Sequence, residues 1–244
     1  MNPGKHLDYL LQQWPYDPEC ACVRLVKGCD GRDVIQLRVD LGILQLETSG
    51  RPDGQKPDGF DTLLDRLLDE EQKSPDFELD EDVCMEIDRE FVQFYQRRVA
   101  WLRLQNFQRA MQDADHTLAL MDFCHDHSPD EQWTLRHEQH RAFVIFHRTQ
   151  AAALAAVEEE SAEDAIQHIE EGLEAIRESF ADMGWEDQFE EDELVQRLQQ
   201  LQVSLRDEFS VGKSLRERLA EAVATEQYEL AARLRDELTR RSEN

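Results

Sequence analysis

The C-terminal thirty residues carry the clearest periodic pattern of apolar positions in the chain. Four apolar residues follow the i, i+4, i+7, i+8 spacing that places side chains on one side of a helix: Leu215, Leu219, Ala222 and Val223. Ser214 and Glu217 have the spacing of a capping box, in which two side chains satisfy free backbone N–H groups of the first turn. The pattern therefore predicts a helix that begins directly after Ser214.

A second apolar stripe follows a polar break at residues 225–227, and its members are Tyr228, Ala231, Ala232, Leu234 and Leu238. The two stripes predict a helical hairpin whose alanines let the helices approach closely. Burial of about seven large apolar side chains, at about 1.5–3 kcal/mol each, does not offset the cost of ordering about thirty residues at roughly 1.5 kcal/mol each. The hairpin therefore needs a further surface to cover its apolar stripe.

Helical periodicity also dominates residues 61–205. This region begins with two pairs of adjacent leucines, which start at Leu63 and at Leu67. Residues 101–120 resemble a tetratricopeptide repeat, and a looser copy follows at 151–176. The interlocking positions are Phe107, Ala110, Ala114 and Leu118 in the first copy and Ala153, Ala156, Ala165, Ile169 and Leu173 in the second. Two copies are too few for a solenoid, so we expect a compact helical bundle. Ser128, directly before Pro129, is predicted to cap one of its helices.

The N-terminal third is rich in turn residues and β-branched residues. Segments 22–26, 34–39 and 43–47 predict a three-stranded antiparallel meander, with a tight turn at Asp30 and Gly31. The expected fold class is therefore α+β, predominantly α. We expect three domains: a small β-containing domain at 1–60, a helical tetratricopeptide-like region at 61–205 and the hairpin at 206–244.

Residues 222–238 resemble the UVR motif, a hairpin found in the B and C subunits of the bacterial excision nuclease, in Clp-type unfoldases and in activators of protein-arginine kinases. The most specific part of the match is the Ala-Ala-x-Leu-Arg-Asp core at 231–236. Residues 14–18 and the segments that follow also resemble bacterial proteins that carry this motif at the C-terminus. In the UVR family the hairpin associates with itself or with a related hairpin. The resemblance thus implies partner-binding positions, namely Leu215, Leu219, Ala222, Val223, Tyr228, Ala231, Ala232, Leu234, Arg235, Asp236 and Leu238.

The net charge of −27 limits the classes of partner. Residues 213–241 hold seven basic and six acidic side chains, so the hairpin is +1 and the remainder of the chain is −28. A remainder with that charge is repelled by phosphate, and no basic patch offsets it, so we expect no direct contact with nucleic acid. With no long apolar segment and no signal peptide, the chain is expected to be cytoplasmic and without membrane contact. An odd number of cysteines, five, predicts reduced thiols.

One group of residues has the right chemistry for a metal site: Cys124, His125 and His127, followed by His137 and His140. The last two histidines are three residues apart, which differs from the spacing of a metalloprotease helix. Cys20, Cys22 and Cys29 also lack paired spacing. No phosphate-binding glycine loop or nucleophile turn occurs. We therefore expect no enzyme, no metal and no cofactor, and a metal-binding sensor or an enzyme that uses the Cys/His group is the alternative.

The sequence thus predicts an interaction adaptor that binds a UVR-bearing partner or itself through the hairpin. The resemblance links such an adaptor to excision repair or to protein quality control. Trp14 and Tyr16 remain open to two interpretations, a concave aromatic site or packing of the chain terminus onto the sheet.

Overall fold

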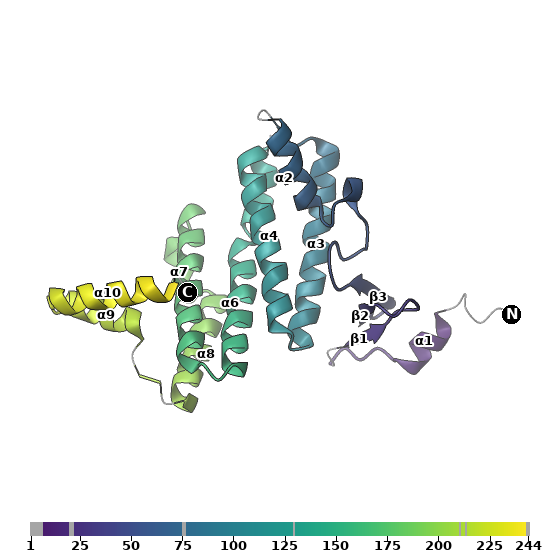
Figure 1. Ribbon diagram of the computed structural model, residues 1–244. Helices are drawn as coiled ribbons and strands as arrows, with labels where there is room; N and C mark the ends of the chain where they lie inside the picture. The colour runs from purple at the N-terminus through teal and green to yellow at the C-terminus, as the bar shows by residue number, and fades with distance from the viewer. Residues whose placement is uncertain are drawn as a thin grey trace. The chain divides into compact units, whose positions relative to one another are not determined.

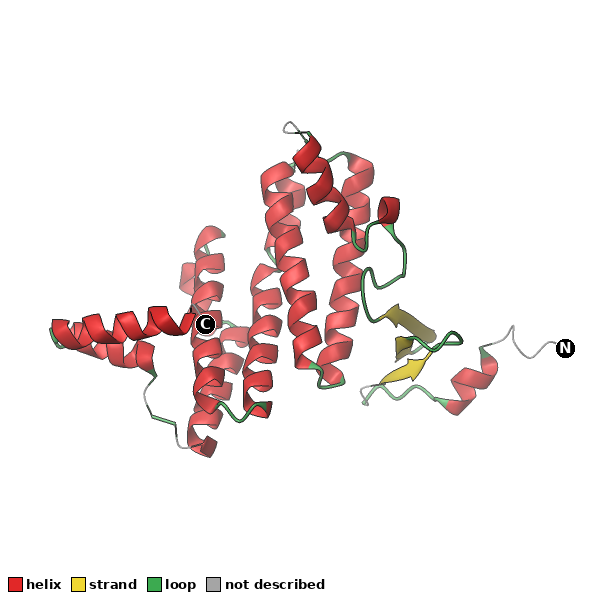
Figure 2. Cartoon of the chain, in the orientation of Figure 1, coloured by secondary structure: helices red, strands yellow, loops and turns green. Residues whose placement is uncertain are grey.

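The computed structural model describes residues 7–19, 22–74, 77–128, 130–209, 211–212 and 214–242. The chain divides into two compact units, residues 1–151 and 152–244, and the division falls within one helix, α6 (Arg141–Glu158). The ribbon is mostly helical with one small sheet (Figures 1 and 2). This confirms the predicted fold class, α+β and predominantly α. The expected three-domain division at residues 60 and 205 stays a prediction.

The sheet at the N-terminal end of the first unit has three antiparallel strands in the order β1-β2-β3. They are β1 (Val23–Lys27), β2 (Asp33–Val39) and β3 (Gly42–Glu47), so the predicted meander is confirmed. The turn between the first two strands places Gly31 at a φ of 87°, which glycine adopts without a steric penalty. Ile35 and Leu37 lie on one face of the central strand and are buried.

The strands are preceded by a short helix, α1 (Asp8–Gln13), and followed by a 3₁₀ turn, η1 (Pro57–Gly59). The rest of the first unit is helical and ends within α6. Its other helices are α2 (Leu63–Lys73), α3 (Glu81–Arg103), α4 (Phe107–His127) and α5 (Glu131–Glu138). A capping box at Thr62 and Asp65 begins α2. The expectation that Ser128 caps the next helix is wrong. Asp130 caps α5 by accepting a hydrogen bond from the Gln132 N–H at 2.9 Å.

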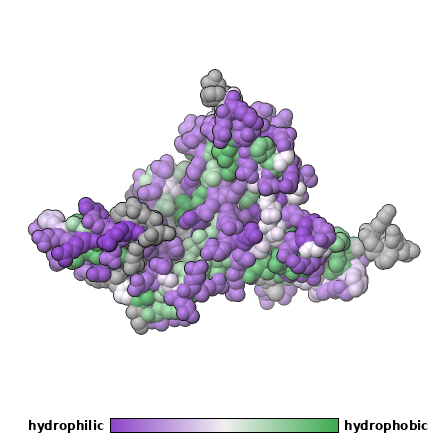
Figure 3. Space-filling model, viewed as in Figure 1, coloured by the Kyte–Doolittle hydropathy of each residue, from purple (hydrophilic) through white to green (hydrophobic). Residues whose placement is uncertain are grey.

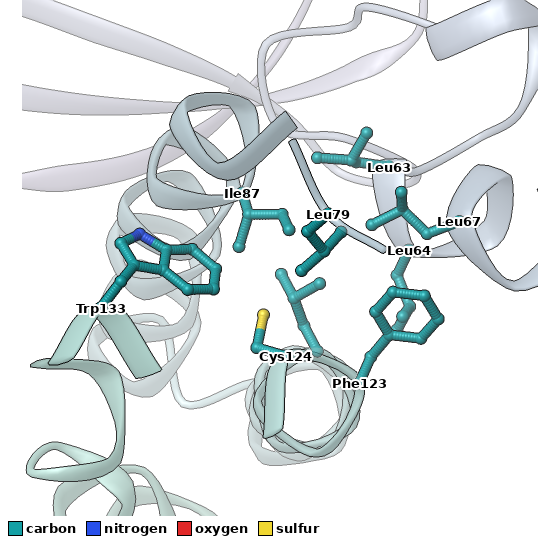
Figure 4. Close-up of a cluster of buried hydrophobic side chains, with 9 residues drawn as sticks. Leu63, Leu64, Leu67, Leu79, Ile87, Phe123, Cys124 and Trp133 are labelled. Atoms are coloured by element: carbon teal, nitrogen blue, oxygen red, sulfur yellow. The ribbon is translucent and has the colours of Figure 1, made fainter. Parts of the chain in front are cut away.

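The core of this unit is an apolar cluster between α2, α3, α4 and α5 (Figure 4). Its buried members are Leu63, Leu64, Leu67, Leu79, Ile87, Leu120, Phe123, Cys124 and Trp133. The predicted leucine stripe of the first helix therefore supplies one wall of the core. Residues 101–120, which resemble a tetratricopeptide repeat, span the end of α3 and most of α4, and these two helices pack along each other.

A row of buried polar side chains crosses the packed face of α3. Arg97 binds both carboxylate oxygens of Asp113 on α4, with the closest contact at 2.7 Å. The same guanidinium donates to the backbone carbonyls of Glu47 and Gly50, which ties the end of the sheet to α3. One buried arginine thus holds three segments in register.

The neighbouring Arg98 is 1% exposed, and its hydrogen-bond partners among the described residues are both neutral. Its Nη1 donates to Thr117 at 3.0 Å and its Nε to Nδ1 of His147 at 3.3 Å. Burial lowers the pKa of Arg98 to about 10. Burial, together with the adjacent positive charge of Arg98, lowers the pKa of His147 to about 4. His147 is therefore a neutral acceptor in the folded protein at pH 7.

This arrangement predicts a loss of stability on acidification. An unfolded histidine takes up a proton near pH 6.5, whereas folded His147 does so only near pH 4. Between these values the unfolded state binds more protons, so the free energy of unfolding falls as the pH is lowered, by about 2 kcal/mol at pH 5. Urea unfolding at pH 7 and pH 5 should show this loss in the wild type. In a His147→Gln variant, which accepts a hydrogen bond but does not titrate, the loss should be smaller by that amount. Equal losses in the two proteins would contradict the account.

The second unit contains the rest of α6 and four further helices: α7 (Ala162–Asp182), α8 (Glu193–Phe209), α9 (Leu215–Ala224) and α10 (Tyr228–Ser242). A 3₁₀ segment, η2 (Glu186–Glu191), joins α7 to α8 and buries Phe189. Helices α7 and α8 pack together through buried aliphatic residues, namely Ile166, Ile169, Ile176, Val195, Leu198 and Leu205. The last two helices form a hairpin, as predicted.

Candidate functional site: the C-terminal hairpin

The hairpin begins with the predicted capping box. Ser214 Oγ accepts a hydrogen bond from the Glu217 N–H at 3.1 Å, and Glu217 Oε2 accepts one from the Ser214 N–H at 2.9 Å. The two reciprocal bonds satisfy donors that a helix N-terminus otherwise leaves without a partner. They fix the residue at which α9 begins.

The turn of the hairpin lies where the apolar spacing breaks. The Gln227 N–H donates to the Ala222 carbonyl at 2.7 Å, and the Thr225 hydroxyl donates to the Glu221 carbonyl at 2.7 Å. Glu226 adopts a φ of 56°, in the left-handed region that reverses the chain after a helix. Helix α10 then begins at Tyr228 and runs back along α9.

The two helices bury three small or branched residues between them. Ala222, Ala231 and Leu234 are 2%, 7% and 2% exposed, and Leu215 and Leu219 pack against them. The alanines supply the close approach of the helices, and Leu234 supplies most of the buried volume. Five of the predicted partner-binding residues therefore form the interior of the hairpin itself.

A different set of predicted residues remains on the surface. Val223 and Tyr228 flank the turn and are 53% and 68% exposed. Leu230, which lies two residues further along α10 and is not in the predicted set, is 40% exposed. We use the name tip patch for these three exposed residues near the turn, of which Tyr228 and Leu230, two positions apart on one helix, point to different sides. Most of the hairpin surface visible in Figure 3 is hydrophilic.

Four other predicted positions lie along α10. Ala232 is exposed. Arg235 and Asp236 are both exposed and pair with each other through Nη2 and Oδ1 at 3.0 Å. The Leu238 side chain lies outside the described part of the structure. The structure thus divides the predicted surface into an interior set, a tip patch and a charged pair.

The Cys/His group of the alternative interpretation is dispersed. Cys124 is buried in the apolar core, and burial raises the pKa of its thiol strongly. His137 Nε2 pairs with Asp88 at 2.8 Å, and the same oxygen accepts from the Trp133 indole at 3.0 Å. His127 pairs with Glu71 on α2.

The two remaining histidines of the group, His125 and His140, are exposed. Among the described residues, no three His, Cys, Asp or Glu side chains are grouped so that they could hold a metal ion. The four described cysteines, Cys22, Cys29, Cys84 and Cys124, are free thiols, and Cys20 lies outside the described residues.

The N-terminal aromatic residues pack against arginines of the sheet. The Arg24 guanidinium lies 4.1 Å from the centre of the Trp14 ring, and Arg38 donates to the Trp14 carbonyl at 2.8 Å. Arg38 also lies over the Tyr16 ring. These contacts favour the packing interpretation of Trp14 and Tyr16.

Comparison with known protein families finds a match in the hairpin. The family described as the UvrB/uvrC motif matches residues 213–241, which span the whole described hairpin from Ser214 to the last turn of α10. No curated protein and no solved structure matches the chain. The chain therefore carries a UVR motif, a hairpin that mediates protein–protein interaction in proteins of the UvrB/UvrC type. Within the described residues, no helix combines the length and apolarity needed to span a bilayer.

Proposed function

We propose that the α9–α10 hairpin binds a second UVR hairpin, either in another copy of this chain or in a different protein, and that the chain is an adaptor. The observation that supports this most is the tip patch, because Val223, Tyr228 and Leu230 stay exposed within a matched interaction motif. Aromatic and aliphatic anchors of this kind supply most of the binding energy in protein interfaces. We infer that the exposed Arg235 and Asp236 set the register by charge pairing with the partner.

The small interior of the hairpin also favours a partner. Its fully buried side chains, within the described part of the hairpin, are two alanines and one leucine, and a buried leucine contributes only about 1.5–3 kcal/mol. Ordering the 25 residues of α9 and α10 costs more than this interior supplies. Additional apolar burial at the tip patch would make the hairpin more stable when it is bound than when it is free.

The remaining parts of the proposal concern the class of protein. We infer a cytoplasmic, non-enzymatic adaptor without metal or cofactor, linked to excision repair or to protein quality control through a UVR-bearing partner. The −28 charge outside the hairpin supports a protein partner over DNA or RNA, because phosphate is repelled by a surface of that charge.

Light scattering over a wide range of concentrations tests whether the second hairpin is the chain's own. The full chain is compared with a version that ends at Val211. Self-pairing predicts a dimer that becomes a monomer on truncation, and pairing with another protein predicts a monomer in both cases. A dimer that survives truncation would contradict the assignment of association to the hairpin.

A further inference from the structure

The base of the hairpin contacts α7 and α8 of the same unit through polar side chains. Ser214, the capping residue of α9, donates its hydroxyl to Glu170 Oε2 at 2.8 Å. Within the first turn of the helix, Arg216 Nη2 pairs with Glu171 Oε1 at 3.1 Å. Two adjacent carboxylates of α7 therefore bind the first turn of α9, where the helix dipole also favours negative charge.

Arg206 at the end of α8 completes this contact. Its Nη2 lies 3.3 Å from Glu170 Oε1 and 2.6 Å from Glu217 Oε2, so one guanidinium joins α7, α8 and α9. The Nε of the same side chain is buried and has no hydrogen-bond partner among the described residues. A buried donor without a partner weakens the contact, because the group loses its water and gains no protein acceptor.

Charge and packing indicate that the contact is held weakly. Glu170 and Glu217 approach the same arginine, and burial together with this neighbouring carboxylate raises the pKa of Glu170. A cavity of about 220 Å³ lies between α7 and the hairpin base and is lined by Ile166 and Leu215 among others. Apolar burial between α7 and the hairpin base is therefore incomplete. The contact depends on its ion pairs, which added salt weakens by screening.

We propose that Glu170, Glu171 and Arg206 form an ionic latch that reversibly holds the first turn of α9 on α7 and α8. In the latched state Leu215, a predicted partner-binding residue, faces the cavity beside α7. Release makes this end of the hairpin accessible while the interior formed by Ala222, Ala231 and Leu234 stays intact. The consequence for partner binding rests on the proposed function, but the latch itself does not.

Tryptic cleavage of the bond between Lys213 and Ser214, followed by mass spectrometry, tests the latch in the full chain. The Glu170→Gln/Glu171→Gln variant should be cleaved about tenfold faster than the wild type, because its α7 no longer carries the two charges. The matched control is Glu174→Gln/Glu178→Gln, which removes two exposed charges from the same helix and should change the rate less than about twofold. Arg206→Gln should reproduce the faster cleavage from the α8 side.

Salt gives a second measurement that requires no variant. Raising the ionic strength from about 0.05 M to about 0.5 M should accelerate cleavage of the wild type and have little effect on Glu170→Gln/Glu171→Gln. A peptide of residues 206–220 corrects for the effect of salt on trypsin itself. Unchanged cleavage in Glu170→Gln/Glu171→Gln, or an equal increase in the control variant, would overturn the latch. Neither result depends on a partner, so failure of the latch and failure of the proposed function can be told apart.

Discussion

Replacement of Leu234 by aspartate is expected to unfold the hairpin and to abolish association. Leu234 is 2% exposed and, among the described side chains of α9 and α10, is the only large one that is fully buried. Aspartate removes that apolar volume and places a charge between Ala222 and Ala231, which we expect to cost about 4 kcal/mol. The small interior cannot offset such a loss. Amide hydrogen exchange should show α9 and α10 losing protection, while α7 and α8 keep theirs.

The matched control for the folding part of this prediction is Leu230→Asp, which makes the same chemical change on the same helix. Leu230 is 40% exposed, so the aspartate stays in water and the helices should keep their protection. Retained protection in Leu234→Asp would show that the interior of the hairpin is not formed as described.

The second large effect is expected from the tip patch. Replacing Val223 and Tyr228 together by aspartate should weaken association by about 100-fold or more, because apolar anchors at the centre of an interface dominate its binding energy. Both side chains are more than half exposed, so the hairpin should retain its helices. The measurement is the dissociation constant, with circular dichroism as the check on folding.

Val203 provides a control for this substitution. It lies on α8 and is 58% exposed, close to the 53% of Val223, so Val203→Asp makes the same change on a helix outside the hairpin. Association should be unchanged in Val203→Asp. Weakening of association by Val203→Asp equal to that by Val223→Asp/Tyr228→Asp would indicate a general effect of charge and would remove the tip patch from the interface.

Local features of the fold follow directly from the sequence. The capping box at Ser214, the break at residues 225–227 and the three strands all depend on neighbouring residues, and the structure has each of them. Ser128 shows the limit of this reasoning. Ser128 and Asp130 are both good capping residues only two positions apart, and the spacing alone does not decide which of them begins α5.

The features that the sequence does not predict depend on residues far apart in the chain. Arginine is usually found on the exposed face of a helix. Arg97 and Arg98 are buried because α3 packs on α4. The contact of Ser214 with Glu170 joins residues separated by 44 positions, and no motif relates them. Apolar periodicity treats Val223 of the first stripe and Leu234 of the second stripe alike. It does not show that the hairpin buries Leu234 and leaves Val223 exposed.

Binding of the hairpin to a second UVR hairpin is the central claim, and a titration tests it directly. Two fluorescent peptides serve as probes, residues 206–244 of this chain and the C-terminal UVR hairpin of the excision nuclease B subunit. Each is titrated with the full chain and with the version that ends at Val211. The account predicts that the full chain binds at least one peptide and that the truncated chain binds neither. Absence of binding to both peptides, or equal binding by the truncated chain, would contradict it.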